Sequence, residues 1–346
     1  MTRRDRIELA LTAVAVGLAG LCHFAGFGAV LTFVVAAAAL ALLARLVGTA
    51  TEQLGSRLGS GGASVIQSAL GNLPELFIAL FALNDGLFAV VQAALVGSIL
   101  ANSVLVLGLA FLVGGLRNGP QRFDSSRARI ISTLTFLAAA TMAIPSLASA
   151  FHTPAAAHGE ALSLVCAVVL LVLFVLTLPG FLRSAPGEEH VPARWSVVTT
   201  AVILGAAGTG AAFTSDWFVT ALTPAIDTLH MSQEFAGLVI VAIAGNAVEN
   251  VVGIQLAARN RPDFAVSVIM NSSLQVALAL TPVLVFVSLL FATHLTLVFP
   301  TLLALVLLIA GILGALVVND GESIWEEGAV LVGFYVVIAA SFWWGT

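Results

Sequence analysis

The chain has 346 residues, of which 60% are hydrophobic and only 9% are charged, and its formal net charge is −5. A soluble globular domain carries about a quarter charged residues, so this composition excludes that class and indicates an all-α integral membrane protein whose main partner is the lipid bilayer. All thirteen basic residues are arginines, and they form no basic patch or RNA-binding pattern, so we expect no nucleic-acid partner.

Eleven apolar runs follow one another along the chain, and each approaches the length of about 20 residues that a membrane-spanning helix needs. The first run lies in an N-terminal segment, residues 1–26, which resembles a signal peptide but has no small-residue cleavage site before a soluble region, so we expect a retained helix. The runs 86–114 and 263–292 are long, and those helices are expected to tilt or bend. In order, the predicted spans are 7–23, 27–48, 63–83, 86–114, 129–150, 160–182, 195–214, 234–258, 263–292, 295–318 and 327–344.

The arginines all lie on one side of the membrane if the N-terminus is taken as cytosolic. Cytoplasmic loops of membrane proteins carry an excess of Lys and Arg, so this pattern predicts a cytosolic N-terminus and, after eleven spans, a C-terminus outside. A plasma membrane of bacterial type is the expected location, because no eukaryotic targeting segment is present. The arginines are Arg3, Arg4, Arg6, Arg45, Arg57, Arg117, Arg122, Arg127, Arg129, Arg183, Arg194, Arg259 and Arg261.

One short motif occurs twice in the chain. ALGNLPE, which ends at Glu75, returns as IAGNAVE, which ends at Glu249, 174 residues later. The same offset maps Ser98 onto Ser272 without a gap. Each copy therefore combines a carboxylate with a hydroxyl on the next helix.

This self-similarity predicts two five-helix repeats, residues 27–183 and 195–346, joined by a cytosolic linker at 184–194. Because five is odd, the second repeat is inverted in the membrane relative to the first. Equivalent residues of inverted repeats meet near the bilayer midplane. The fold class expected is therefore one leading helix followed by two inverted five-helix repeats, about eleven transmembrane helices in all.

Glu75 and Glu249 are the two acidic residues expected deep in the membrane, where a lone carboxylate is costly. They become tolerable if they face each other with a cation or two protons between them. Like charges at close range favour protonation, whereas a bound cation favours the charged carboxylates. We therefore predict that this pair binds a metal ion and protons in alternation.

Two carboxylates cannot supply the six to eight oxygens that Ca²⁺ takes. Pro74 lacks an N–H and frees the carbonyl of Leu70, while Gly71 and Gly245 loosen the same turns, so these backbone carbonyls are candidate ligands. All these ligands are oxygens, which suits Ca²⁺, Mn²⁺ or Na⁺ as a transported ion and disfavours zinc or copper, and no cofactor is expected. The polar side chains expected to line the site are Asn72, Ser98, Asn102, Asn246, Ser272, Ser273 and Gln275.

Three long stretches resemble the calcium/cation:proton antiporters, the CAX branch of the Ca²⁺/cation antiporter superfamily. Residues 71–108, beginning GNLPE, resemble the first signature repeat of that family, and residues 245–278, beginning GNAVE, resemble the second. Residues 319–339 resemble the segment before and through its last helix. The resemblance implies a secondary antiporter that exports cytosolic Ca²⁺ in exchange for protons by alternating access, with Glu75 and Glu249 as the central acidic pair.

Three residues depart from the usual pattern of that family. They are Pro74 in the first motif, Asn250 beside the second glutamate, and Asn271 before the serine pair. These departures bear on cation selectivity and on the response to pH rather than on transport itself.

Other functions are possible for such a chain. A Na⁺/H⁺ or Na⁺/Ca²⁺ exchanger is the alternative within the same class, and a passive cation channel or a membrane enzyme is the alternative outside it. The sequence contains no HExxH, no GxSxG, no phosphate-binding loop and no Ser–Lys pairing, so we do not expect an enzyme.

An acidic run at 320–327 precedes the last predicted span. Ser323 and Glu326 have the spacing of a capping box, in which a serine and a glutamate three residues later satisfy the first N–H groups of a helix. We therefore expect this run to begin a helix rather than to bind a cation.

Overall fold

The structure, a computed structural model, describes residues 1–181 and 193–345, and describes their side chains except at 55–69, 179–181 and 248. The predicted linker at 184–194 therefore lies outside the described residues except for its last two. The described chain is mostly helical. In order its elements are α1 (Arg3–Ala25), α2 (Ala29–Leu70), α3 (Leu73–Asn84), α4 (Phe88–Leu100), η1 (Ala101–Val106), α5 (Leu107–Asn118), β1 (Gln121–Arg122), α6 (Ser125–Ala150), η2 (Pro154–His158), α7 (Gly159–Phe181), α8 (Val197–Leu229), α9 (Gln233–Phe235), η3 (Ala236–Val241), α10 (Ala242–Gly245), α11 (Ala247–Ala258), α12 (Pro262–Gln275), η4 (Val276–Leu280), α13 (Thr281–Ser288), α14 (Thr301–Val317), β2 (Glu322–Ser323) and α15 (Trp325–Phe342).

Every predicted span overlaps a helix of the structure. By length and hydropathy, eight helices in the described part of the chain could cross a membrane. A ninth is added if Gln233–Gly245 and Glu249–Ala258, which are bent by 65° at their break, form one span. Two further apolar helices, α3 and α14, are shorter. The count of eleven membrane crossings stays a prediction.

The seventh predicted span, 195–214, is too short, because α8 continues to Leu229. Polar residues at 214–216 lower the local hydropathy, which ended the predicted span, but they do not interrupt backbone hydrogen bonding in a helix. The helix ends at His230, which adopts the left-handed conformation with φ 53°.

The described chain divides into two compact units that are interleaved along the sequence. Unit 1 consists of Met1–Asp85, Leu173–His230 and Ala244–Val248. Unit 2 consists of Gly86–Val172, Met231–Ile243 and Glu249–Thr346.

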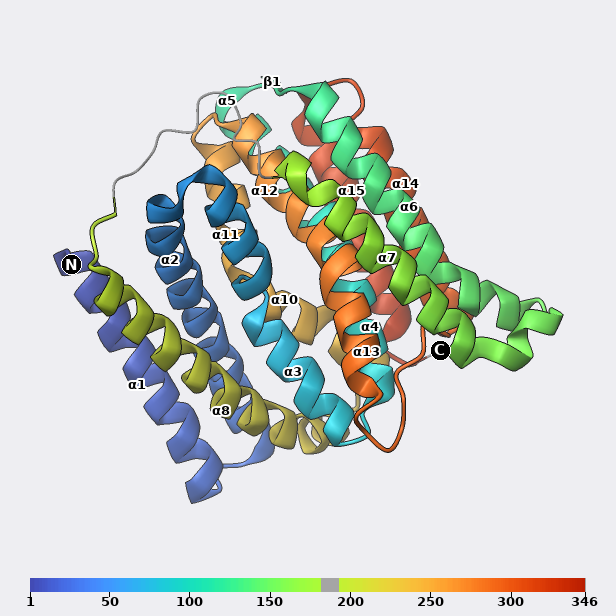
Figure 1. Cartoon of the computed structure of the whole chain (residues 1–346), viewed down its shortest axis with the longest axis horizontal. Helices are drawn as coiled ribbons and strands as arrows, with labels where there is room; N and C mark the ends of the chain where they lie inside the picture. Colours follow the sequence, from blue (N-terminus) through green and yellow to red (C-terminus); the bar gives the residue numbers. More distant parts are fainter. Residues whose placement is uncertain (182–192, 346) are drawn as a thin grey trace. The chain divides into compact units, whose positions relative to one another are not determined.

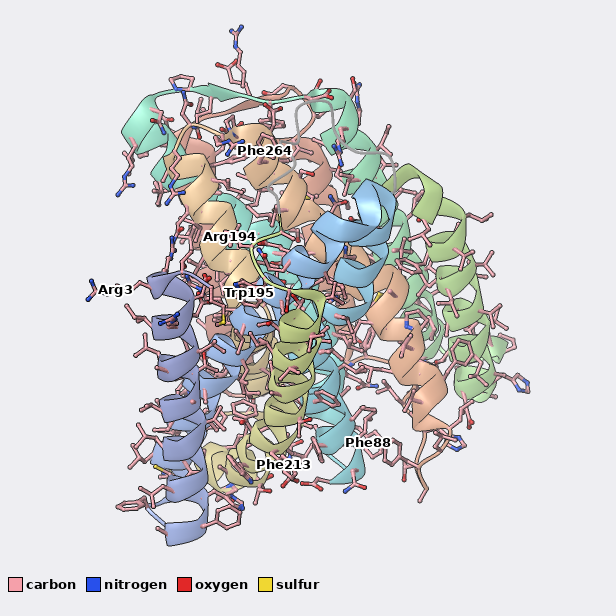
Figure 2. All side chains as sticks on the ribbon, turned by 60° about the vertical axis from the view of Figure 1, so that its left-hand side comes forward. Arg3, Phe88, Arg194, Trp195, Phe213 and Phe264 are labelled. Atoms are coloured by element: carbon pink, nitrogen blue, oxygen red, sulfur yellow. The ribbon has the colours of Figure 1, made fainter. Side chains whose placement is uncertain are left out.

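In unit 1, α1, α2 and α3 each pack against α8 (Figure 1). A buried tryptophan connects one end of α1 to the start of α8. Trp195 is 3% exposed, and its indole N–H donates to Oδ2 of Asp5 at 3.0 Å. Gln53 of α2 accepts the backbone N–H groups of Arg194 and Trp195 at 2.7 and 3.2 Å. Figure 2 shows Arg194 and Trp195 where the chain enters α8, at the end of α1 that carries Arg3.

The other end of α1 is held by a second tryptophan of α8. The ring of Trp217 lies against Gly20, where a Cβ would come within 3.0 Å of it, and it stacks on His23 with ring centroids 5.9 Å apart. A side chain at position 20 would therefore have to displace the indole by a few tenths of an ångström. α1 is thus fastened to α8 near both of its ends.

At one end of unit 2, three loops join through a two-stranded sheet, and we call this the β end. β1 and β2 are antiparallel, with Gln121 opposite Ser323. Gln121 also donates to the carbonyl of Ala257 at 3.0 Å and to Oδ1 of Asn260 at 2.9 Å. These three loops, which precede α6, α12 and α15, are all predicted to be cytosolic from the arginine pattern.

At the other end of unit 2 lies a buried, non-helical segment, residues 295–299, which we call the strap (Figure 1). A buried backbone must have its polar groups paired, and here side chains replace the missing helical bonds. Ser146 donates to the carbonyl of Leu297 at 2.9 Å and accepts the N–H of Phe299 at 2.8 Å. Ser163 accepts the N–H of Leu297 at 2.9 Å, and Ser288 accepts the N–H of Leu295 at 2.8 Å.

Gln92 of α4 completes this pairing, since its amide donates to the carbonyls of Thr296 at 2.8 Å and Val298 at 3.2 Å. Beside the strap, His294 contacts Glu160 at the start of α7 at 2.6 Å, which brings together two parts of the chain predicted to lie at the outer side. In unit 2, the loops predicted to be cytosolic thus lie together at the β end, and segments predicted to be outside lie together at the strap end. Which end faces the cytosol stays a prediction.

The strap corrects the tenth predicted span, 295–318, because its helix begins only at Thr301. Residues 295–299 are apolar enough to suggest a span, but Pro300 follows them, and a residue before proline is disfavoured from helical conformation.

The predicted capping box of Ser323 and Glu326 is wrong by one residue. Ser323 lies in β2, and α15 begins at Trp325. The backbone N–H of Ile324 donates to Oε2 of Glu327 at 3.5 Å, so the acidic run does mark a helix start.

Helix boundaries recur 174 residues apart, the offset that relates the two motifs. α3 and α11 both have twelve residues and begin at Leu73 and Ala247. α4 and α12 begin at the same offset, as do α5 and α13. The π-helical segment η1 lies between α4 and α5, and η4 lies between α12 and α13. π-helical turns inside α-helices occur frequently at functional sites.

Labelling of introduced cysteines tests the sidedness of unit 2. In a background without Cys22 and Cys166, both of which are buried, Arg122→Cys at the β end and His158→Cys at the strap end are exposed positions. A membrane-impermeant maleimide should label His158→Cys on intact cells, and Arg122→Cys only after permeabilisation. Labelling of both positions from the same side would contradict the predicted topology.

Candidate cation site

Glu75 lies at the third position of a helix that begins inside the protein. α2 ends at Leu70 and α3 begins at Leu73, so that Gly71 and Asn72 form a break between them. Pro74 is in the first turn of α3, where backbone N–H groups have no acceptor within the helix, so α3 loses no hydrogen bond through the missing N–H of proline. Glu75 is only 3% exposed. A helix N-terminus carries partial positive charge, so this break favours a buried carboxylate.

The second motif contacts the first within unit 1. A Cβ added to Gly245 would lie 3.3 Å from Cβ and 3.4 Å from Cγ of Glu75, so the backbone of α10 packs directly on the glutamate side chain. The next residue, Asn246, is fully buried and separates α10 from α11. Gly245 therefore serves as a contact surface for Glu75, and any side chain there would press against the carboxylate.

Glu249 occupies in the second motif the place that Glu75 occupies in the first. α11 begins at Ala247, directly after Asn246, so Glu249 is also the third residue of a twelve-residue helix that follows a break. Its side chain belongs to unit 2 and is half-buried. Both carboxylates thus lie beside the N–H groups of a helix start, where negative charge is stabilised.

A polar pair connects the two following helices within unit 2. Asn102 of η1 donates to Oγ of Ser272 on α12 at 3.1 Å, and both side chains are buried. Ser98 lies one turn before Asn102 and Ser273 follows Ser272, and neither is exposed to solvent. We call these four residues, all of which were predicted from the sequence, the polar level of unit 2: the bonded pair Asn102 and Ser272, with Ser98 and Ser273 beside them on the same two stretches of helix.

The packing of Gly253 places Glu249 near the polar level. A Cβ at Gly253 would lie 2.6 Å from Cγ1 of Ile269 and 3.8 Å from Cγ1 of Val106, so α11, α12 and η1 meet at this glycine. One turn back along α11 is Glu249. One turn back along η1 is Asn102, and one turn forward along α12 is Ser272, its hydrogen-bonded partner.

The remaining predicted residues are less enclosed. Asn72 and Gln275 are half-buried, as are Leu70 and Gly71 at the break before α3. One polar side chain near Glu249, Asn250, was not among the predicted residues although it is 9% exposed. Its sequence signal is its spacing to Gly253 and Ala257, which places all three on one face of α11.

The sodium/calcium exchanger protein family matches this chain twice, at residues 28–183 and at residues 199–344. The Ca²⁺/H⁺ antiporter ChaA of Bacillus subtilis (strain 168) is 34% identical over 350 residues, which cover 98% of this chain and 99% of that protein. The Ca²⁺/H⁺ antiporter of Synechocystis sp. (strain ATCC 27184 / PCC 6803 / Kazusa) is 30% identical over 369 residues, covering 99% and 98%.

Solved structures agree with these sequence matches. The structure of native YfkE superimposes with a TM-score of 0.84 at 32% identity, covering 97% of this chain and 99% of that one. The crystal structure of the H⁺/Ca²⁺ exchanger CAX gives a TM-score of 0.78 at 15% identity, covering 98% and 92%, a likeness of fold alone.

Removing the buried hydroxyls tests whether the polar level takes part in cation binding. Ser98→Ala and Ser272→Ala should each lower the apparent affinity for Ca²⁺ a few-fold and leave the protein folded in the membrane, because each deletes one neutral oxygen. Calcium uptake into reconstituted vesicles at varied Ca²⁺ gives that affinity.

Ser341→Ala is the matched control, since Ser341 donates only to the carbonyl of Ile338 in its own helix. It should leave the affinity unchanged. Unchanged affinity in the Ser98 and Ser272 variants as well would mean that these serines serve only in helix packing.

Proposed function

Because the chain belongs to the sodium/calcium exchanger protein family, we propose that it is a secondary active antiporter that exports cytosolic Ca²⁺ in exchange for protons. Two relatives that align over nearly its whole length are named as Ca²⁺/H⁺ antiporters, which supports this choice of ions. Such a protein is a transporter rather than an enzyme, and Ca²⁺ and H⁺ are its substrates.

Glu75 and Glu249 form the exchange site in this proposal. The observation that carries it is the packing of Gly245 on the side chain of Glu75, since Glu249 follows Gly245 by four residues. Consecutive Cα atoms are about 3.8 Å apart, so the chain itself limits the separation of Gly245 and Glu249 to about 15 Å. The backbone of Glu249 therefore lies within about 15 Å of the residue that packs on Glu75.

Two carboxylates are balanced equally well by one Ca²⁺ or by two protons. In either loaded state the site carries no net charge, which lowers the cost of enclosing it in the apolar interior while it is closed to both sides. A site that binds the two in competition exchanges one for the other. With Ca²⁺ bound, the neutral oxygens of Asn72, Asn246 and the polar level supply further ligands, as a hard cation requires.

The two halves of the chain act as inverted repeats in this proposal, and alternating access opens the site to each side of the membrane in turn. The helix boundaries that recur 174 residues apart support the repeat. So does the match of one family to each half of the chain. The site then lies near the bilayer midplane, at the breaks before α3 and α11.

The N-terminus and the β end face the cytosol, and the strap end faces outward, in a plasma membrane of bacterial type. The arginine pattern supports this orientation. The bacterial relatives support the location.

Exchange of Na⁺ for Ca²⁺ or for H⁺ is the alternative within the same family. It differs in one measurable respect, because a Na⁺ gradient would then drive Ca²⁺ or H⁺ flux at constant pH. A passive channel would conduct Ca²⁺ without any proton gradient.

Neutralising either carboxylate should abolish exchange. Glu75→Gln and Glu249→Gln keep the size of the side chain but remove a charge, so the site loses half of its neutralising charge for Ca²⁺ and one of two proton carriers. We expect Ca²⁺ flux driven by a pH gradient in reconstituted vesicles to fall to background in both variants. Aspartate at either position should retain part of the flux, because it keeps the charge with a shorter reach.

Glu160→Gln is the control, since Glu160 is an exposed carboxylate that contacts only His294 among the described residues. Its flux should equal that of the wild type. Near-wild-type flux in either Glu75→Gln or Glu249→Gln would remove the carboxylate pair as the exchange site.

A further inference from the structure

Asn250 is a buried amide that has no hydrogen-bond partner for its oxygen. The side chain is 9% exposed, and Oδ1 accepts no hydrogen bond from any described residue. Buried polar atoms are nearly always paired, because an unpaired one loses its hydration without compensation. Among the described residues, the oxygen of Asn250 is therefore available to a ligand.

The orientation of Asn250 follows from the burial pattern of α11. Asn250 and Ala257 are buried, and Gly253 between them packs closely on its neighbours. These three lie on one face of the helix at a spacing of three and four residues. Val251 and Val252, on the opposite side, are 49% and 39% exposed. Asn250 thus belongs to the face that packs inside unit 2.

The contacts of this face show what Asn250 points toward. Ala257 packs against Gly114 of α5, where a Cβ would lie 3.2 Å away. Gly253 packs against Ile269 of α12 and Val106 of η1. The next position along the face, Asn250, therefore lies one turn beyond Val106 and Ile269, which is the polar level.

A second unpaired oxygen lies at this level. Ser273 is fully buried, and its Oγ has no hydrogen-bond partner among the described residues. Asn250 and Ser273 come from two helices that are packed together at Gly253. Both offer the hard oxygen that divalent cations such as Ca²⁺ bind.

We propose that Asn250, with Ser273, is a cation ligand that sets the affinity for Ca²⁺, an inference that rests on the proposed function. A neutral amide oxygen coordinates the cation but carries no proton in exchange. It therefore strengthens Ca²⁺ binding relative to protonation without changing the number of protons that the site can hold. Asn250 in this way determines the balance between the two substrates, whereas Glu75 and Glu249 carry the charge.

Direct binding of Ca²⁺ to the purified full-length protein tests this role. Asn250→Leu removes the oxygen at similar volume, and isothermal titration with CaCl₂ should show Kd raised about tenfold. The thermal unfolding midpoint without Ca²⁺ should not fall, because no hydrogen bond to Oδ1 is lost. Asn250→Asp keeps an oxygen in place and adds charge, so it should bind Ca²⁺ at least as tightly as the wild type at alkaline pH.

Asn118→Leu is the matched control. Asn118 donates to the carbonyls of Gly114 at 3.1 Å and Ala257 at 3.2 Å, so its loss should lower the unfolding midpoint and leave Kd unchanged.

Wild-type affinity in Asn250→Leu, or weaker binding in Asn250→Asp, would overturn the role of Asn250 alone. Absence of Ca²⁺ binding by the wild type would overturn the proposed function and this inference with it.

Discussion

The central physical constraint in this protein is the placement of carboxylates at helix starts inside an apolar chain. A helix that begins in the interior leaves N–H groups without intrahelical partners, and these groups carry partial positive charge. A carboxylate three residues into such a helix makes use of that charge, as Glu75 and Glu249 both do. The glycine and asparagine before each of them create the break, and so the same few residues produce both the helix start and the anion that it stabilises.

One neutral oxygen lies on a second irregularity, since Asn102 is in the π-helical segment η1 that follows α4. Such a turn shifts the register of backbone hydrogen bonds and turns side chains relative to a regular helix. At this point of unit 2 the chain places Asn102 against Ser272, with Asn250 one turn from the packed glycine of α11. The carboxylates thus rely on breaks in helices. In the polar level Asn102 lies in a distorted turn, whereas Ser98, Ser272 and Ser273 lie in regular α-helix.

The sequence predicted the elements that depend on local chemistry. Hydropathy located a helix for every span. The repeated motif marked loosened turns at both glycines, but the predicted spans 63–83 and 234–258 ran through the points where the helices break. The strap was missed because five apolar residues look alike in a helix and in a buried extended segment, and only Pro300 distinguishes them. The role of Gln92 could not be predicted from the sequence, because it donates to backbone carbonyls about 200 residues further along the chain, and any residue type offers a backbone carbonyl. Asn250 was noted only as a departure from the family pattern and not as a lining residue, because its equivalent in the first motif is Leu76 and a search for repeated polar residues passes over it.

The strap and the side chains that hold it are expected to differ in how well they tolerate substitution. Its own residues take part in hydrogen bonds only through their backbone, so another apolar residue of similar size at 295, 297 or 299 keeps every one of those bonds. The side chains that hold it cannot be replaced by apolar residues in this way, since Ser146, Ser163 and Gln92 donate or accept through a hydroxyl or an amide that apolar residues lack. Evolutionary drift is therefore expected to alter the strap readily, while the restraint on its shape lies in the neighbouring helices that surround it.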